Sequence, residues 1–159
     1  MPAGTMLAGV LLMAATAPGA ETTVRLQVPK QVTAEAASRA AGNAASPAPI
    51  LMLEGLELGA GEGIEILVLG PAEPRAGSSR RPLLGTAGMV GSPQARPAVP
   101  VERVTLAIAL NDKASRLLAR KHAVTLTLQV EGSPGRPPLR FKRAYFDTGG
   151  SSAPAGRPP

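Results

Sequence analysis

His122 is the only histidine in the chain, so any imidazole chemistry depends on this one side chain. A copper or zinc site of the histidine type needs several imidazoles on neighbouring elements, which one histidine cannot supply. A serine triad would need Ser115 and Asp147 as partners, and neither lies in a nucleophile-elbow sequence. An exposed position at the end of a helix, favoured by the helix dipole, explains His122 better. We therefore predict no catalytic residue and no metal ligand in this chain.

Glycines at positions 59, 61 and 63 have a spacing similar to that of a phosphate loop. The lysine and hydroxyl residue that end a P-loop are missing, and no helix pattern follows, so phosphate binding is not predicted. A hairpin turn explains these glycines better. The nearby glutamates do not form an acid–base pair either, because strand spacing places Glu54 and Glu57 on opposite faces. We interpret them, with Glu62 and Glu65, as solvated surface residues and predict no cofactor site.

The net charge of +6 would permit binding to acidic partners. Recognition of single-stranded nucleic acid also needs aromatic side chains between the cations, and this chain has only Phe141, Tyr145 and Phe146. We therefore predict no nucleic-acid partner. The four cations between residues 136 and 143 are better explained as a solvated strand edge that discourages unwanted pairing.

The elements that would position these residues are mostly strands, because apolar and polar residues alternate with a period of two along much of the chain. The 18 glycines and 17 prolines divide these runs into short segments. The predicted strands are Thr22–Pro29, Ile50–Leu58, Ile64–Leu69, Leu83–Val90, Val101–Leu110, Ala123–Glu131 and Leu139–Asp147. Leu83–Val90 has the weakest pattern, and Gly55 is expected to form a bulge. About seven short strands predict an all-β, antiparallel β-sandwich.

One short helix is predicted at about Asp112–Lys121. Asn111 or Asp112 can accept hydrogen bonds from the free amides at its start. Apolar residues then recur at i, i+3 and i+4 from Ala114. The alanine-rich segment Val32–Ala45 could form a helical turn or two, but its low complexity favours a loop.

These elements define one domain over residues 21–147, between an apolar leader or linker at 1–20 and a disordered Pro/Gly-rich tail at 148–159. Tryptophan is absent and aromatic residues are only 2% of the chain, so the core is expected to be aliphatic. The predicted core residues are Val24, Leu26, Leu53, Ile66, Val68, Leu106, Ile108, Leu117, Leu126 and Leu128.

The N-terminal apolar run Met6–Ala17 leaves the cellular location open. It is too short to span a bilayer, so no transmembrane segment is predicted, but it has about the length of a signal-peptide apolar region. Ala15-Thr16-Ala17 resembles a cleavage site, whereas no cation precedes Arg25 and Pro18 would follow the cut. The absence of cysteine does not decide the compartment. Export of the protein and an apolar linker in a cytoplasmic chain both remain open.

Four stretches resemble the C-terminal domain of bacterial and plant tyrosinases and polyphenol oxidases. Glu21–Leu26, followed by an alanine-rich gap, is similar to the opening strand of that domain. Leu51–Leu56 and then Gly63–Leu69 are similar to its leucine-glutamate-glycine-isoleucine strand and the strand after it. Leu84–Gly91 is similar to its short alanine-glycine-threonine strand, and the elements of Val104–Phe146 are similar to its closing strand–helix–strand–strand arrangement.

The resemblance implies a β-sandwich that packs over the dicopper site of a preceding helical domain and restrains its activity until it is displaced or cleaved. In this family the domain can place an aromatic side chain in the active-site entrance. This sequence departs from the family in two ways. Ile64–Leu69 lacks the usual aspartate between aromatic residues, and no aromatic residue occurs where a plug would sit.

The sequence also lacks the copper-binding domain and its histidines, so it cannot oxidise phenols by itself. We therefore expect a non-catalytic accessory domain without a cofactor of its own. Its expected partner is a tyrosinase-like catalytic domain that holds two copper ions. Docking should depend on an apolar sheet face, which Leu67→Lys would disrupt if Leu67 lies on that face. The alternative is an exported, stand-alone β-sandwich that binds a protein or a surface polymer.

Overall fold

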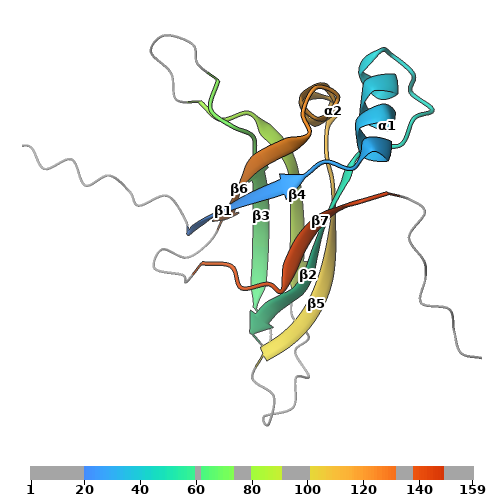
Figure 1. Ribbon diagram of the computed structural model, residues 1–159. Coiled ribbons are helices and arrows are strands. Elements are labelled where there is room, and N and C mark those ends of the chain that lie inside the picture. The colour runs from blue at the N-terminus through green and yellow to red at the C-terminus, as the bar shows by residue number, and fades with distance from the viewer. Residues whose placement is uncertain (1–19, 60–61, 74–79, 91–100, 132–137, 149–159) are drawn as a thin grey trace, which may run out of the picture.

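The computed structural model describes residues 20–59, 62–73, 80–90, 101–131 and 138–148 (Figure 1). The predicted leader (1–20) and tail (148–159) lie outside the described residues except for Ala20 and Thr148. The strands are β1 (Glu21–Gln27), β2 (Ile50–Gly59), β3 (Gly63–Leu69), β4 (Leu83–Val90), β5 (Val101–Ala109), β6 (Ala123–Glu131) and β7 (Arg143–Asp147). The helices are α1 (Lys30–Ala40) and α2 (Asp112–Leu118). No helix in the described part of the chain is long and apolar enough to cross a membrane.

The strands form two antiparallel sheets, one with the order β1-β6-β3-β4 and the other with the order β5-β2-β7. The two sheets make a sandwich, and both helices lie together at one end of it (Figure 1). The predicted all-β antiparallel sandwich is confirmed. One connection differs from the prediction: β2 and β3 belong to different sheets, so the glycine-rich segment between them is not a hairpin turn. It carries the chain from one sheet to the other.

Aliphatic side chains from the inward faces of both sheets fill the space between them. In β6, Val124, Leu126, Leu128 and Val130 are buried at the predicted period of two, and Thr127 on the opposite face is buried as well. Eight of the ten predicted core residues are buried, while Val24 and Leu117 are partly buried and pack against the same cluster. Phe146 is the only aromatic residue in the buried cluster of the described chain.

Gly55 shifts the register of β2 at the position where the sequence predicted a bulge. The pairing of β2 with β5 slips between Leu53 and Leu56, and Gly55 has a φ of +70°. Before the bulge the odd-numbered residues Leu51 and Leu53 are buried, and after it the even-numbered residues Leu56 and Leu58 are buried. As a result Glu54 and Glu57 share the outward face of the sheet, and the prediction that they lie on opposite faces was wrong.

The bulge also explains why β7 is shorter than predicted, starting at Arg143 instead of Leu139. Before β7, the carbonyl of Arg140 accepts from the amide of Glu57 at 2.9 Å, and the amide of Lys142 donates to the carbonyl of Glu54 at 2.8 Å. These two bonds straddle Gly55 instead of forming a regular ladder. A Cβ atom on Gly55 would lie 2.8 Å from the Cβ of Lys142, so the close approach requires glycine.

The structure has two helices where the sequence predicted one. α2 starts as predicted, but α1 occupies the alanine-rich segment that was predicted to be a loop. Its N-cap residue is Pro29, which supplies no side-chain hydrogen bond, so the usual start signal is missing. Val32 and Ala36, one turn apart, are both buried, and α1 packs against α2. Tertiary packing, which propensity does not report, therefore stabilises this helix.

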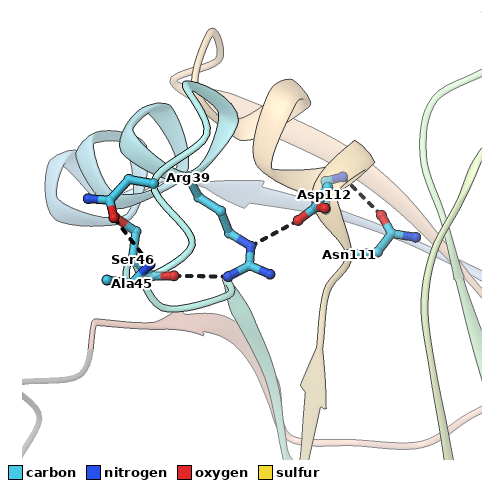
Figure 2. Close-up of polar contacts among 7 residues, drawn as sticks. Arg39, Ala45, Ser46, Asn111 and Asp112 are labelled. Carbon is cyan, nitrogen blue, oxygen red and sulfur yellow. Dashed lines mark hydrogen bonds and ion pairs between the residues drawn. The ribbon is translucent and has the colours of Figure 1, made fainter.

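Polar contacts hold the helices at this end of the sandwich, which we call the helical corner (α1, α2, residues 41–49 and Leu110–Asn111). Figure 2 shows the guanidinium of Arg39, at the end of α1, between two segments. Its Nε donates to Asp112 Oδ1 at 2.9 Å, and its Nη1 donates to the carbonyl of Ser46 at 2.9 Å. The last turn of α1, the loop after it and the start of α2 are thereby joined.

Asn111 connects α2 to strand β4. Its Oδ1 accepts from the amide of Ala114 at 3.2 Å, which caps the helix as the sequence predicted. Its Nδ2 donates to the carbonyl of Leu83 at 2.8 Å, and its backbone amide donates to the carbonyl of Leu84 at 2.7 Å. One side chain therefore starts a helix and fixes that helix to the edge of a sheet.

Candidate docking surfaces

The three residues considered for a catalytic triad occupy different environments. His122 is exposed beyond the end of α2, and its carbonyl accepts from the amide of Val28 at 2.8 Å. Ser115 is fully buried in α2, and its hydroxyl has no hydrogen-bond partner among the described residues. Asp147 lies in β7 of the three-stranded sheet, where it pairs with Ile50. A buried serine without a bonded base is not an activated nucleophile.

In the glycine-rich connection between β2 and β3, a glutamate carboxylate is bonded to a backbone amide. The carboxylate of Glu62 accepts from the amide of Gly59 at 2.6 Å, and the amide of Glu62 donates to the carbonyl of Gly59 at 3.1 Å. The Gly59 amide, which a phosphate would need, is therefore already bonded to a carboxylate. In the described residues, no group of three or more histidine, cysteine, aspartate or glutamate side chains could hold a metal ion.

Ion pairs occupy the outward face of the three-stranded sheet. Glu54 Oε2 lies 2.5 Å from Arg143 Nε, and Glu57 Oε1 lies 3.5 Å from Arg103 Nη2. The hydrogen bond and charge of Glu54 raise the pKa of Arg143 above its ordinary value, so this guanidinium stays charged. Arg143 also lies over the ring of Tyr145, 4.8 Å from its centroid. The two glutamates act as partners of cations and not as an acid–base pair.

The aromatic residues offer no common binding platform. Phe146 is buried in the core, and Tyr145 is half-buried beneath Arg143. Phe141 lines a hollow of about 520 Å³, together with Arg103, Arg140 and other residues around the Gly55 bulge. The three rings therefore have separate surroundings, and stacking of successive bases on them is not supported.

The outward face of the four-stranded sheet has a different character. Leu67 and Leu69 of β3 alternate with buried Ile66 and Val68, so they point away from the core and are half-buried. Leu69 pairs with Leu83 of β4, which is 42% exposed. We call Leu67, Leu69 and Leu83 the Leu67 patch. The structure buries one face of β3 fully and leaves Leu67 and Leu69 on the other face half-buried.

Polar side chains surround the Leu67 patch. Leu67 pairs with Gln129 on one side and with Thr86 on the other, while Leu69 pairs with Thr127. Nη1 of Arg81 lies 3.4 Å from the hydroxyl of Thr127 and 3.2 Å from Glu21, which closes one side of the patch. An apolar centre with a polar rim is the usual anatomy of a protein–protein interface.

A second surface lies beside α2. A groove of about 720 Å³ runs between α2 and the two segments 71–73 and 82–84. We call it the α2 groove. Its cationic lining residues are Lys113, Arg116, Arg120 and Lys121. The cations at 113, 116 and 120 are three and four residues apart, which is the spacing of residues on one side of a helix, although α2 itself ends at Leu118. This spacing in the sequence could have indicated a cationic surface.

No protein-family model matches the sequence, and no curated protein matches it. Comparison with solved structures does find similar proteins. One is a latent aurone synthase (polyphenol oxidase) from natural source, with a TM-score of 0.53 and 11% identity. The match covers 82% of this chain and 25% of that one. Another is a recombinantly expressed latent aurone synthase (polyphenol oxidase), with a TM-score of 0.51 and 13% identity over the same shares of the two chains.

This chain thus spans about a quarter of the length of the solved polyphenol oxidase chains that it matches. At such low identity the likeness shows a shared fold. It confirms the resemblance predicted from the sequence at that level: the chain has the β-sandwich of one part of a polyphenol oxidase, consistent with the C-terminal domain.

Proposed function

We propose that this chain is a non-catalytic accessory domain that packs against a tyrosinase-like dicopper oxidase and shields its active site. The observation that carries the proposal is the structural likeness to about a quarter of a polyphenol oxidase. Both matched structures are of an aurone synthase described as latent, a property that suits a domain that restrains activity.

The residues of this chain do not fit the copper ions that such an enzyme uses. A dicopper centre needs multiple imidazoles held by rigid elements, and the whole sequence contains one histidine. His122 is also exposed and lies outside any group of metal-binding side chains in the described residues. The copper chemistry is therefore assigned to the partner, and the role of this chain is to bind that partner and exclude substrate.

The Leu67 patch is the proposed docking surface. Its three leucines gain free energy when a partner removes them from water, at about 25 cal/mol per Å² of apolar surface. The residues that border it are mainly threonines and a glutamine, so docking would not require the burial of an unpaired charge. The outward face of the other sheet suits docking less well, because its glutamates and arginines form ion pairs that a partner would desolvate.

The experiment is affinity purification of the tagged chain from its own cells, followed by measurement of diphenol oxidation with and without the chain. We expect the chain to co-purify with a dicopper oxidase and to lower its rate of oxidation. Leu67→Lys should abolish both effects, because it inserts a charge into the apolar centre. Thr105→Lys is the matched control, since Thr105 is exposed on the outward face of the three-stranded sheet and should not affect docking.

Recovery of the chain without a copper oxidase, and with no effect on oxidation, would overturn the proposal. Recovery with a cell-surface protein or polymer, from a mature chain that lacks its first residues, would support an exported binding module instead. The isolated chain loaded with Cu²⁺ should not oxidise diphenols, and His122→Ala should leave its fold and its partner binding unchanged. Turnover that disappears in His122→Ala would contradict the accessory role.

A further inference from the structure

The α2 groove combines a cationic side with an apolar side. The cations Lys113, Arg116, Arg120 and Lys121 are all exposed. Its apolar lining residues include Pro71, Pro82 and Leu84 from outside the helix and Leu117 from α2. Glu73 is the one carboxylate among the lining residues. Leu84 is almost fully buried, so the inner end of the groove is apolar and its rim is positively charged.

The fold does not use the charges of these four cations. Within the described residues, none of the four makes an ion pair or a side-chain hydrogen bond. By contrast, Arg39, Arg81, Arg103 and Arg143 each lie against a carboxylate. Arg116 lies in the last turn of α2, and Arg120 lies just beyond the end of the helix. The four charges are therefore available to an anion that enters the groove.

The chain itself has little to offer as that anion. The segments outside the described residues contain Arg75, Arg96, Arg136 and Arg157, but no aspartate or glutamate. A second copy of the chain is also a poor candidate, because its net charge of +6 would repel the first. Glu73 is the one carboxylate among the lining residues in the described chain, so the anion proposed below lies outside residues 1–159.

We propose that the α2 groove binds an acidic segment of a partner protein, with carboxylates against the four cations and an aliphatic side chain against Leu84 and Leu117. The lining favours a peptide over a nucleic acid, because it contains no aromatic side chain on which a base could stack. It favours a peptide over a membrane surface, because the apolar residues lie inside a groove and not on a protruding face. The inference stands on the groove alone and does not require that the partner be a copper oxidase.

Fluorescence anisotropy with a defined probe tests this proposal on the full chain. The probe is a fluorescein-labelled peptide rich in glutamate with one central leucine, and the control peptide has glutamine in place of each glutamate. We expect the acidic probe to bind, and the bound fraction to fall as NaCl is raised, because exposed charge pairs are screened by salt. The glutamine peptide should bind at least about tenfold more weakly, a difference equivalent to the loss of one favourable charge contact.

Two pairs of substitutions locate the binding site. Arg116→Glu with Arg120→Glu should weaken binding of the acidic probe by about 100-fold or more, since each reversal places like charges together. Arg116→Gln with Arg120→Gln should weaken it less and keeps the test valid if charge reversal disturbs α2. Arg25→Glu with Arg140→Glu changes the net charge equally at exposed sites outside the groove and should alter affinity by less than about threefold.

Three results would overturn the inference. The first is equal loss of affinity in the groove variants and in the Arg25/Arg140 control, which would mean that the probe responds only to net charge. The second is equal binding of the acidic and glutamine peptides. The third is displacement of the probe by duplex DNA or by phosphatidylserine vesicles at lower concentrations than by unlabelled peptide, which would assign the groove to another class of partner.

Discussion

The space between the two sheets and the helical corner are stabilised by different interactions. Between the sheets, the side chains are almost all aliphatic, and they pack without directional bonds. At the helical corner, Arg39 and Asn111 join segments that are far apart in sequence through hydrogen bonds of 2.7–3.2 Å. The burial of an apolar side chain tolerates small changes in direction, whereas a hydrogen bond needs both partners in place. The two regions should therefore respond to substitution with different magnitudes.

Leu126→Ala should give the largest effect. Leu126 is fully buried in a central strand, so its truncation removes apolar contacts and leaves a cavity, at a cost of about 2–5 kcal/mol in the free energy of unfolding. Urea denaturation followed by circular dichroism measures this loss. A cost below about 1 kcal/mol would show that the space between the sheets is not the main source of stability.

Asn111→Ala should give an intermediate effect. It removes the cap of α2 and the side-chain bond to Leu83, for a loss of about 1–3 kcal/mol. Asn111→Asp is the matched variant, because its carboxylate can still cap the helix but cannot donate to the Leu83 carbonyl. It should lose less stability than the alanine variant in the same denaturation assay. Equal losses would mean that the cap contributes little to the corner.

The ion pair between Arg39 and Asp112 should contribute less than the cap of α2. Asp112 is 69% exposed, so water and salt screen the pair. A double-mutant cycle with Arg39→Ala and Asp112→Ala should give a coupling energy of about 0.2–1 kcal/mol that falls at high salt. A coupling as large as the Leu126→Ala cost would remove the distinction between the two regions.

Ser115→Ala should have the smallest effect and the opposite sign. In the part of the chain that the structure describes, the buried hydroxyl of Ser115 has no hydrogen-bond partner, so alanine removes an uncompensated polar group and adds helix propensity. We expect unchanged stability or a gain of up to about 1 kcal/mol, seen as a higher thermal midpoint. A clear loss of stability would show that the hydroxyl is bonded in solution.

The sequence predicts the region between the sheets better than the helical corner. Alternation in β6 and the other strands reports directly which side chains are buried, because one residue faces each side in turn. The bulge at Gly55 was predicted. The faces of Glu54 and Glu57 were predicted wrongly, because a bulge between two residues reverses which alternate positions face outward. The connection after β2 was predicted as a hairpin because local spacing does not show which sheet the next strand joins.

The helical corner shows why local patterns were sufficient for one helix and not for the other. α2 has Asn111 as a cap and an apolar stripe, so it was predicted from local residues alone. α1 has Pro29 at its N-cap, and only its contact with α2 reveals why Val32 and Ala36 are apolar. The same limit applies to the surfaces. Leu67 was identified as a test residue, but the Leu67 patch and the α2 groove depend on residues that only the fold brings together.

The pairing of β1 with β6 has a consequence for biosynthesis. Thr22 of the first strand lies opposite Leu128, more than 100 residues later in the chain. While the chain emerges from a ribosome, β1 therefore has no partner until nearly the whole domain has been translated. Contacts between such distant segments slow folding and leave apolar strands exposed in the meantime. A nascent chain of this kind would depend on chaperones to protect β1, and a stop codon before β6 would release a product with no route to the native sheet.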